Sequence, residues 1–322
     1  MRILLAFLLL IAFPAVAAEL PVPPWQSALG RDHPLVGRIW LPAERRFAEP
    51  TELSHRLAAA DFVLLGEHHD NPDHHRLQAW ALAQIIAVGR RPPVAFEMVS
   101  PEQAPAMRRH LAAHPGDVDG LEAALDWSNN HWPDWAMYRP IFAEAVQAGM
   151  TLRPANLPQN VLHALARSWP LPDVTRHYYR LDQTLDASTA AALAEEIRAS
   201  HCGQLPEKVV PAMVEVQRAR DAAMALAMTE DAPTGAVLIA GAGHTRNDRG
   251  VPVQVAALAP GRPIFSLAFI QVADDEADPD QTLPFDAVIF TPRIDDDDPC
   301  AGLAEFLKKK REAEEQKEKE KQ

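Results

Sequence analysis

Residues 62–75 read FVLLGEHHDNPDHH and join a short apolar run to a polar turn, with four histidines in all. The run at 62–65 is continuously apolar, which is typical of a strand covered on both faces of a parallel sheet. Asn71 followed by Pro72 is typical of a helix start, since asparagine caps the first backbone N–H groups and proline fits the first turn. A strand, a turn at Gly66 and a helix therefore follow one another directly, which is the unit of an α/β sheet.

A second segment, residues 236–244, reads AVLIAGAGH and has the same layout of apolar strand, glycine turn and histidine. Each turn has the spacing Gly-x-x-His, at 66–69 and at 241–244. Strands of one parallel sheet end at a common edge, where ligands of α/β proteins gather. His69 and His244 are therefore predicted to approach one another, although they are 175 positions apart in the chain.

The rest of the chain predicts an α/β fold with a mostly parallel sheet flanked by helices. Further apolar runs separated by helical patterns are typical of parallel strands joined by crossover helices. Residues 158–228 have helical patterns and no strand pattern, which predicts an inserted smaller all-helical subdomain. Further strands are expected at 94–96, 151–153, 264–270 and 287–290, and helices at 75–88, 101–114, 121–125, 135–147, 189–199 and 209–228.

The two ends of the chain predict export and a charged appendage. Residues 1–18 combine a positive charge, an apolar run and a small-residue cleavage site, the pattern of a cleaved signal peptide. The run is shorter than the ~20 residues of a spanning helix, so we expect no integral membrane segment after cleavage. The mature protein is expected to be soluble and periplasmic or secreted, with an α/β domain at 19–300 and a charged C-terminal tail at 301–322.

Charge and cysteine content limit the partners and the compartment. The formal net charge is −13, and an acidic body argues against nucleic acid as a partner. The two cysteines, Cys202 and Cys300, have no Cys-x-x-Cys spacing that would indicate a zinc site. In an oxidising compartment such a pair either forms a disulfide or stays free, and the sequence leaves both alternatives open.

Two carboxylates and two histidines are expected at the shared strand edge. Glu67 lies in the first turn, and Glu97 follows the apolar run at 94–96. With His69 and His244 they are the predicted catalytic set of a hydrolase, acting as general acid and base. Glu67, His69 and His244 are also a predicted ligand set for a divalent cation that activates water. The structural alternative is that Glu67 only caps backbone N–H groups.

Other histidines and tryptophans have structural interpretations. His74 and His75 fall in the first turns of a predicted helix, and at least one of them is expected to be exposed at the surface. Tryptophans are more often core residues than ligand-binding surface. We therefore expect Trp127, Trp132 and Trp135 in the core, with a ligand-covering surface as the alternative.

Residues 65–75 (LGEHHDNPDHH) and 241–252 (GAGHTRNDRGVP) resemble the opening and closing signatures of the ChaN-like haem-binding uptake family. Weaker similarity occurs at 155–158 and 217–221, so the resemblance covers most of the mature chain. It implies an α/β domain with an inserted helical domain, and haem held where two protomers of a homodimer meet. It also implies kinship with Tiki and TraB proteins and erythromycin esterases, in which the two turns and nearby glutamates serve hydrolysis.

The resemblance predicts an exported haem-binding protein that acts in haem or iron uptake, with haem as its cofactor. Haem ligation in the family resembles a tyrosinate type, and histidine and methionine also serve as axial ligands. If haem binds at the helical insert, the candidate ligands are His177, Tyr178, His201 and Met213. The alternative function is a metal-dependent hydrolase that uses the two Gly-x-x-His turns and a divalent metal ion.

Overall fold

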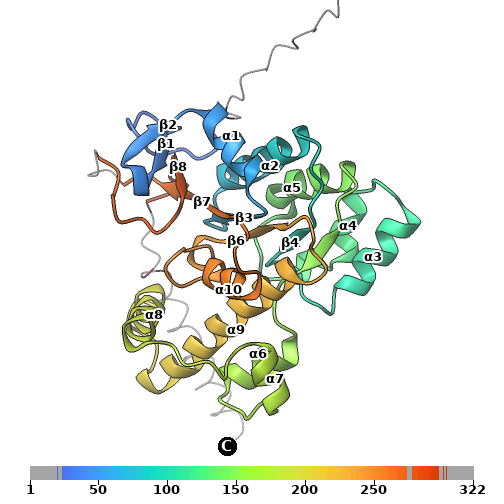
Figure 1. The fold of residues 1–322 in the computed structure, drawn as a ribbon, viewed down its shortest axis with the longest axis vertical. Helices are drawn as coiled ribbons and strands as arrows, with labels where there is room; N and C mark the ends of the chain where they lie inside the picture. Colours follow the sequence, from blue (N-terminus) through green and yellow to red (C-terminus); the bar gives the residue numbers. More distant parts are fainter. Residues whose placement is uncertain (1–19, 21–23, 274–277, 297–299, 301, 303–322) are drawn as a thin grey trace, which may run out of the picture.

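The computed structural model describes residues 20, 24–273, 278–296, 300 and 302, and contains a mixed, mostly parallel sheet of eight strands with helices on both faces (Figure 1). The strand order is β2-β1-β8-β7-β3-β6-β4-β5. The α/β class predicted from the sequence is therefore confirmed. The predicted signal peptide at 1–18 lies outside the described residues, as does the predicted C-terminal tail apart from residue 302.

The six strands expected from apolar runs are all present and pair in parallel. The central strands β3 and β6 are buried along their whole length, because helices cover both faces of the sheet. Burial on both faces explains why their sequences are continuously apolar. The bounds are β3 (Phe62–Glu67), β4 (Val94–Phe96), β5 (Leu152–Pro154), β6 (Ala236–Gly241), β7 (Ile264–Gln271) and β8 (Ala287–Thr291).

A short antiparallel hairpin at one edge of the sheet is not predicted by the sequence. It consists of β1 (Ile39–Leu41) and β2 (Arg46–Ala48), and β1 pairs antiparallel with β8. A single 3-10 turn and Arg45, with φ of 51°, connect the two strands. The sequence of β2 (RFA) is not a continuous apolar run, and the run of β1 (IWL) does not belong to a strand–helix–strand unit, so the pattern that predicts the parallel strands does not indicate this hairpin.

Successive side chains of β3 point to opposite faces of the sheet, and a different set of helices covers each face. On one face Val63 and Leu65 pack under α1 (Pro50–Ala59), α2 (Pro72–Ala87) and α5 (Trp135–Gln147). On the other face Phe62 and Leu64 pack under α9 (Val210–Thr229) and α10 (Val251–Leu258). Two further helices beside the first face are α3 (Ala104–Ala113) and α4 (Asp119–Ala124).

Four α-helices lie between β5 and β6: α6 (Gln159–Ala166), α7 (Asp173–Tyr178), α8 (Ala187–Ser200) and α9. Residues 155–235 are all described, and none of them is in a strand. Val216 and Ala219 of α9 pack with Leu165 of α6 and Tyr179, whereas Met224 and Met228 pack on the sheet. One long helix thus joins the helical region to the sheet, and in Figure 1 α6 and α7 lie below α9 and α8 lies beside it, all away from the strands.

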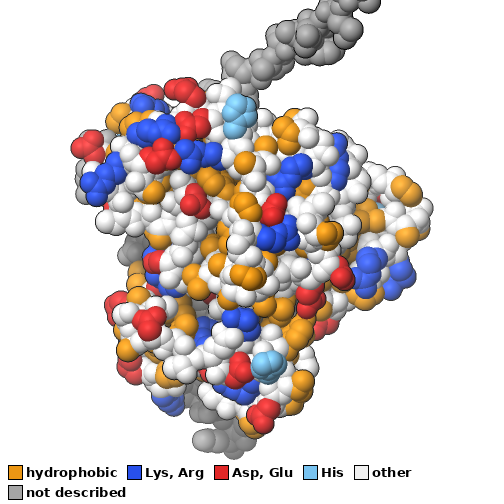
Figure 2. Space-filling model, viewed as in Figure 1, with side chains coloured by type: hydrophobic (Ala, Val, Ile, Leu, Met, Phe, Trp, Pro, Cys, Tyr) orange, Lys and Arg blue, Asp and Glu red, His pale blue; other side chains and the backbone are white. Residues whose placement is uncertain are grey.

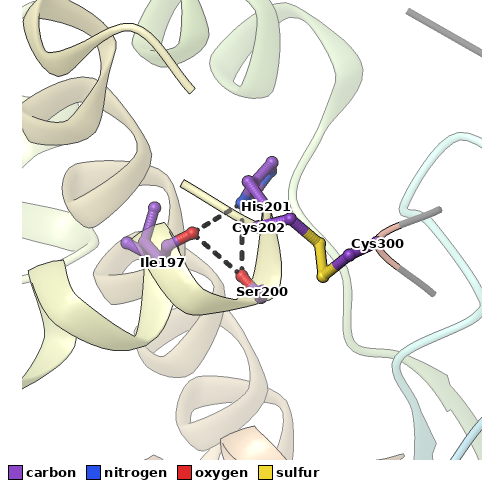
Figure 3. The surroundings of a disulfide bond; sticks show 5 residues. All are labelled: Ile197, Ser200, His201, Cys202 and Cys300. Atoms are coloured by element: carbon purple, nitrogen blue, oxygen red, sulfur yellow. Dashed lines mark hydrogen bonds between the residues drawn. A yellow bond between two sulfur atoms is a disulfide. The ribbon is translucent and has the colours of Figure 1, made fainter. Parts of the chain in front are cut away.

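The two cysteines form a disulfide (Figure 3), so of the alternatives left open by the sequence the structure has the bonded one. The Cα atoms of Cys202 and Cys300 are 5.4 Å apart. Cys202 follows the C-terminus of α8, and Cys300 lies beyond the last strand, β8. The bond ties the helical region to the chain segment that follows the sheet.

The surface view adds two observations. Basic and acidic side chains are interspersed on the face drawn in Figure 2, with no large patch of one sign. Within the described part of the chain, no helix has the length and apolar character needed to span a membrane.

Candidate functional site

The two Gly-x-x-His turns lie side by side at the carboxyl edge of the sheet. β3 and β6 are neighbouring parallel strands, in a register that places Glu67 opposite Gly241. The backbone N–H of Glu97, directly after β4, donates to Ile239 O at 3.0 Å, so Glu97 reaches the same edge. The expected convergence of both turns and both glutamates is therefore what the strand order produces.

Close packing at the edge explains why each turn begins with glycine. A Cβ on Gly66 would overlap Thr245 Oγ1 and lie 3.0 Å from the Cα of Ala242. A Cβ on Gly241 would lie 3.1 Å from His69 Nε2 and 3.7 Å from a Glu97 oxygen. Each glycine thus makes room for the other turn, and the imidazole of His69 lies directly beside Gly241.

Glu67 is the centre of the first polar cluster. Its carboxylate is completely buried and accepts from the Tyr138 hydroxyl at 2.8 Å, while His69 Nδ1 lies 2.8 Å from the same oxygen, Oε1. His75 Nδ1 lies 2.7 Å from the other oxygen, Oε2. Burial alone would raise the pKa of Glu67, but the charge of His75 and the contact with His69 lower that pKa to about 2. Glu67 is therefore a carboxylate at neutral pH.

His75 is a buried cation. Its Nε2 faces the carbonyl of His69 at 2.9 Å, and its Nδ1 faces Gln78 Oε1 at 3.1 Å as well as Glu67. Gln78 must present its oxygen there, because its amide nitrogen donates to Leu65 O. Both ring nitrogens therefore face acceptors, an arrangement that only the doubly protonated imidazolium satisfies. Burial lowers the pKa of His75, but the charge of Glu67 and the hydrogen bonds to Glu67, Gln78 and the His69 carbonyl together outweigh burial and raise it.

The expectation that His74 or His75 is exposed is wrong, since neither has any exposed surface. His74 Nδ1 accepts from the backbone N–H of His68 at 2.8 Å, and Nε2 lies 2.8 Å from Thr291 Oγ1. Burial holds the pKa of His74 well below its usual range, so this ring is neutral. Asn71 caps α2 as predicted, and the cap turns both histidines inward rather than toward solvent.

Glu97 is the centre of the second polar cluster. It is 1% exposed, accepts from the backbone N–H of Gly241 at 2.8 Å, and pairs with Arg220 Nη2 at 2.7 Å. Burial raises the pKa of Glu97, but the charges of His244 and Arg220 outweigh it and lower that pKa. Glu97 is thus a second buried carboxylate at the same edge.

His244 lies between two carboxylates. Its Nδ1 is 2.6 Å from Asp221 Oδ1, and its Nε2 is 3.6 Å from Glu97 Oε1. The amide of Gln217 lies against the same ring, 3.1 Å from Nδ1. Asp221 is 5% exposed, and burial raises its pKa although His244 opposes that shift. A carboxylate on Nδ1 fixes the ring orientation and leaves Nε2 as the reactive nitrogen.

His69 lies at the open side of the edge. Its side chain is 36% exposed, and the ring of Trp132 stands edge-on to it at a centroid distance of 5.0 Å. Burial lowers the pKa of His69, but the contact with Glu67 and the charge of Glu97 outweigh it and raise that pKa. Trp127 and Trp135 are buried in the core as expected, whereas Trp132 is only partly buried.

The predicted metal ligands have different partners. Glu67 and His69 belong to the first cluster, whereas His244 is held by Asp221 and Glu97. Among the described residues, no group of three or more His, Cys, Asp or Glu side chains is arranged to hold a metal ion. The structure therefore does not support the divalent cation expected from Glu67, His69 and His244.

The four candidate haem ligands lie in the helical region between β5 and β6. His177 and Tyr178 are exposed at the end of α7, and His201 is the C-cap of α8. Met213 is partly buried in α9. His177 Nδ1 lies 2.7 Å from Asp182 Oδ2, and the Tyr178 hydroxyl donates to Glu230 at 3.2 Å.

Sequence reasoning missed the partners that hold the site together. Tyr138 comes from α5, 71 positions after Glu67, and no local pattern indicates that contact. Arg220 and Asp221 lie in the weakly family-like stretch 217–221 without an assigned role. One feature of the sequence could have indicated them. Arg220 and Asp221 are adjacent charged residues in an alanine-rich helical stretch, and charged side chains that become buried need partners.

This α/β sheet, with two Gly-x-x-His turns converging on buried carboxylates, defines a protein of the Tiki superfamily type. The model of the family described as haem-binding uptake, Tiki superfamily, ChaN matches residues 53–255. The chain therefore belongs to the ChaN haem-binding uptake family. A comparison with curated proteins finds no match.

A comparison with solved structures finds several that match this chain. A structure described as cofacial haem binding to ChaN of Campylobacter jejuni is 20% identical, with a TM-score of 0.64, and the match covers 78% of this chain and 95% of that one. The erythromycin esterase EreC, in an open conformation, is 12% identical with a TM-score of 0.47, covering 82% and 99%. The type III effector HopBA1 is 15% identical with a TM-score of 0.43, covering 78% and 94%. The match to ChaN shows a common fold.

Proposed function

We propose that this chain is an exported protein that binds haem and serves haem or iron uptake. Family membership supports haem binding. The observation that carries the proposal is one face of α7, on which Val174, His177 and Tyr178 are all exposed. Spaced at i, i+3 and i+4, they share one side of the helix, so the apolar Val174 lies beside two side chains of types that can serve as haem ligands.

His177 has the donor chemistry that a haem iron requires. Because Asp182 holds its Nδ1, the proton resides on Nδ1 and Nε2 keeps a free lone pair. Carboxylates orient metal-binding histidines in this way. Bound haem supplies an iron centre that takes axial ligands, and in our proposal His177 binds it through Nε2 while Val174 contacts the porphyrin.

The other candidates fit this role less well. Iron binds tyrosine as phenolate, but burial and the charge of Glu230 raise the pKa of Tyr178 and keep it protonated. His201 Nδ1 lies 2.7 Å from the carbonyl of Ile197, which leaves its Nε2 free and makes it the second choice. Met213 is partly buried within α9.

Export and a homodimer belong to the same proposal. The Cys202–Cys300 disulfide supports an oxidising compartment. Trp169, Val174 and Tyr178 are 56%, 75% and 48% exposed, and large apolar side chains exposed in one segment are typical of a surface covered in an assembly. A second protomer over this surface would enclose the haem and shield its other face from water.

A ferric-haem titration of the mature protein, followed by absorbance, tests the proposal. We expect a saturable Soret shift, and in His177→Ala a changed ligand-field spectrum with affinity lowered by roughly 10–100-fold. His55→Ala, an exposed histidine on α1, is the matched control and should titrate like the parent protein. Non-saturable binding to the parent protein would refute haem binding, whereas an unchanged His177→Ala spectrum would refute only the ligand assignment.

A second candidate function is hydrolysis at the strand edge, favoured by the Asp221–His244 contact of 2.6 Å. Asp221 orients the ring, so that Nε2 can accept a proton from water next to Glu97. This general-base form is favoured over one built on Glu67, His69 and His244 as metal ligands, because the described residues contain no group of three or more His, Cys, Asp or Glu side chains arranged to hold a metal ion.

Hydrolysis of p-nitrophenyl acetate, followed by release of p-nitrophenolate, tests the second candidate. If the edge is catalytic, His244→Ala and Asp221→Asn should each lower the rate by roughly 10²–10⁴-fold. His55→Ala should leave the rate unchanged, since His55 is an exposed residue of α1. A rate in His244→Ala equal to that of the parent protein would rule out this candidate.

A further inference from the structure

A small cavity lies where strand β5 and helices α7 and α9 end. Its volume is about 190 Å³, which suits a ligand smaller than most drug-sized molecules. Tyr178 and Tyr179 line it from the end of α7, Leu226 and Glu230 from the end of α9, and Pro154 from the end of β5. Apolar walls with a few polar groups are the usual composition of a small-molecule site.

Two tyrosine rings line the cavity nearly at a right angle to each other. The planes of Tyr178 and Tyr179 stand at 83°, and their centroids are 5.0 Å apart. The Tyr178 hydroxyl donates to Glu230 at 3.2 Å, so a carboxylate is held beside the rings. The faces of aromatic rings attract cations, and proteins bind alkylated ammonium groups between such rings.

The charges around the cavity favour a cation. The C-terminal ends of α7 and α9 both lie at the cavity, and this end of a helix has partial negative charge. Burial raises the pKa of Tyr179 to about 12, and neighbouring charges, among them Glu102 and Glu230, add to the rise. Arg153 donates to the backbone carbonyls of Ala227 and Glu230, so this end of α9 already attracts one cation.

Tyr179 provides a polar group that the protein leaves without a partner. The residue is only 8% exposed, yet among the described residues its hydroxyl has no hydrogen-bond partner. Polar groups in buried side chains are nearly always satisfied by protein, water or a ligand. With a pKa of about 12 the hydroxyl keeps its proton at neutral pH, so it can donate to an oxygen atom of a ligand.

From these features we propose that the cavity binds a small organic cation with an alkylated ammonium group. The ammonium group lies against the rings of Tyr178 and Tyr179 with Glu230 as its counter-ion, and the Tyr179 hydroxyl donates to an oxygen of the same molecule. Leu226 and Pro154 contact its alkyl carbons. The lining residues of this cavity include none of the residues of the two polar clusters at the strand edge, so the cation has a site of its own.

Isothermal titration calorimetry with choline tests the proposal. The mature protein is used free of haem, because Tyr178 also belongs to the surface proposed to bind haem. Choline has a trimethylammonium group and a hydroxyl, and dimethylbutanol is its uncharged isostere. We expect saturable binding of choline at one site per chain, and binding of the isostere weaker by roughly tenfold. Choline binding that does not saturate, or equal affinity for the isostere, would overturn the proposal.

Variants assign the binding to this cavity. Tyr178 is 48% exposed, so its replacement removes little core packing. Tyr178→Leu removes one aromatic wall and should weaken choline binding by roughly tenfold, whereas Tyr178→Phe keeps the ring and should stay within about threefold of the parent protein.

A pair of charge variants tests the counter-ion. Glu230→Gln should weaken choline binding by roughly threefold. Glu195→Gln removes a carboxylate of α8 whose side chain is 74% exposed, and this matched control should bind choline like the parent protein. Unchanged affinity in Tyr178→Leu, or an equal decrease in Glu230→Gln and Glu195→Gln, would refute the assignment to this cavity.

Discussion

His75 Nδ1 lies 2.7 Å from Glu67 Oε2, and neither side chain has any surface exposed to solvent. Because both ring nitrogens of His75 face acceptors, this contact is a buried ion pair between an imidazolium and a carboxylate. Buried pairs contribute little net stability, but the loss of one partner leaves an uncompensated charge in the core. The pair therefore fixes the orientation of Glu67, and through Glu67 that of His69.

Removing the carboxylate charge should destabilise the fold strongly. We expect Glu67→Gln to lower the free energy of unfolding by ~3–5 kcal/mol, because His75 is left as a buried cation without its counter-ion. Urea unfolding followed by circular dichroism measures this loss. The double variant Glu67→Gln, His75→Gln should regain part of it, and a double variant as unstable as the sum of both single variants would argue against an ion pair.

The same pair should give the protein a characteristic pH dependence. The pKa of Glu67 falls from 4.5 to about 2 on folding, so its contribution is complete above pH 4.5 and is lost as the pH falls toward 2. The pKa of His75 is raised on folding, so its contribution is complete below 6.5 and is lost as the pH rises through the raised value. The pair should therefore stabilise the fold most between pH 4.5 and 6.5.

The difference in unfolding free energy between the parent protein and Glu67→Gln, measured across pH, reports the interactions of this carboxylate with His75 and with His69. Burial lowers the pKa of His74, so this residue by itself reduces the stability of the fold below pH 6.5. His74 is present in both proteins, so its effect cancels in the difference. A difference that stays constant from about pH 3 to 8 would contradict the assigned charges.

A methyl group in the first turn should separate the two strand ends. Gly66→Ala places a Cβ against Thr245 and the backbone of Ala242, and we expect it to cost ~1–3 kcal/mol as an overpacked core site does. Gly243→Ala is the matched control, because its Cβ would meet only Glu196 Oε1 at 3.4 Å. The midpoint temperatures of thermal unfolding of both variants measure this cost. An equal decrease in the two variants would mean that the two turns are not tightly packed.

Loss of the disulfide should lower stability without removing the fold. For a bond that closes a loop of this size, we expect the double variant Cys202→Ser, Cys300→Ser to lose ~2–5 kcal/mol, because the unfolded chain gains freedom. Urea unfolding under non-reducing conditions measures the loss. Addition of reductant should lower the urea midpoint of the parent protein to that of the variant. If reductant leaves the midpoint of the parent protein unchanged, the disulfide does not stabilise the fold.

The sequence predicts the sheet well because its inner strands have a simple signature. Continuous apolar runs mark β3, β6 and β7, and the shared Gly-x-x-His layout places Glu67, His69 and His244 at one edge. The three-residue strand β2 is not a continuous apolar run, and β1 does not belong to a strand–helix–strand unit, so the sequence does not indicate this hairpin.

The partners of the site residues were beyond sequence reasoning. Tyr138 and Asp221 reach Glu67 and His244 from helices that are distant in the chain, so only the packing of those helices reveals them. The burial of His74 and His75 also depends on packing, because their protonation states follow from neighbours such as Thr291 and Gln78. Local patterns place a residue on an edge, but they do not choose its hydrogen-bond partners.

β6 lies between β3 and β4 in the sheet, although it is made long after both of them. A chain that emerges from its N-terminus first therefore presents two strands with a vacant position between them until residues 236–241 arrive. Unpaired strand edges attract other chains, and late non-local parallel pairing prolongs that exposure during synthesis. We expect the newborn polypeptide to need protection from aggregation until its last third is available, and fragments that stop before residue 236 to precipitate rather than fold.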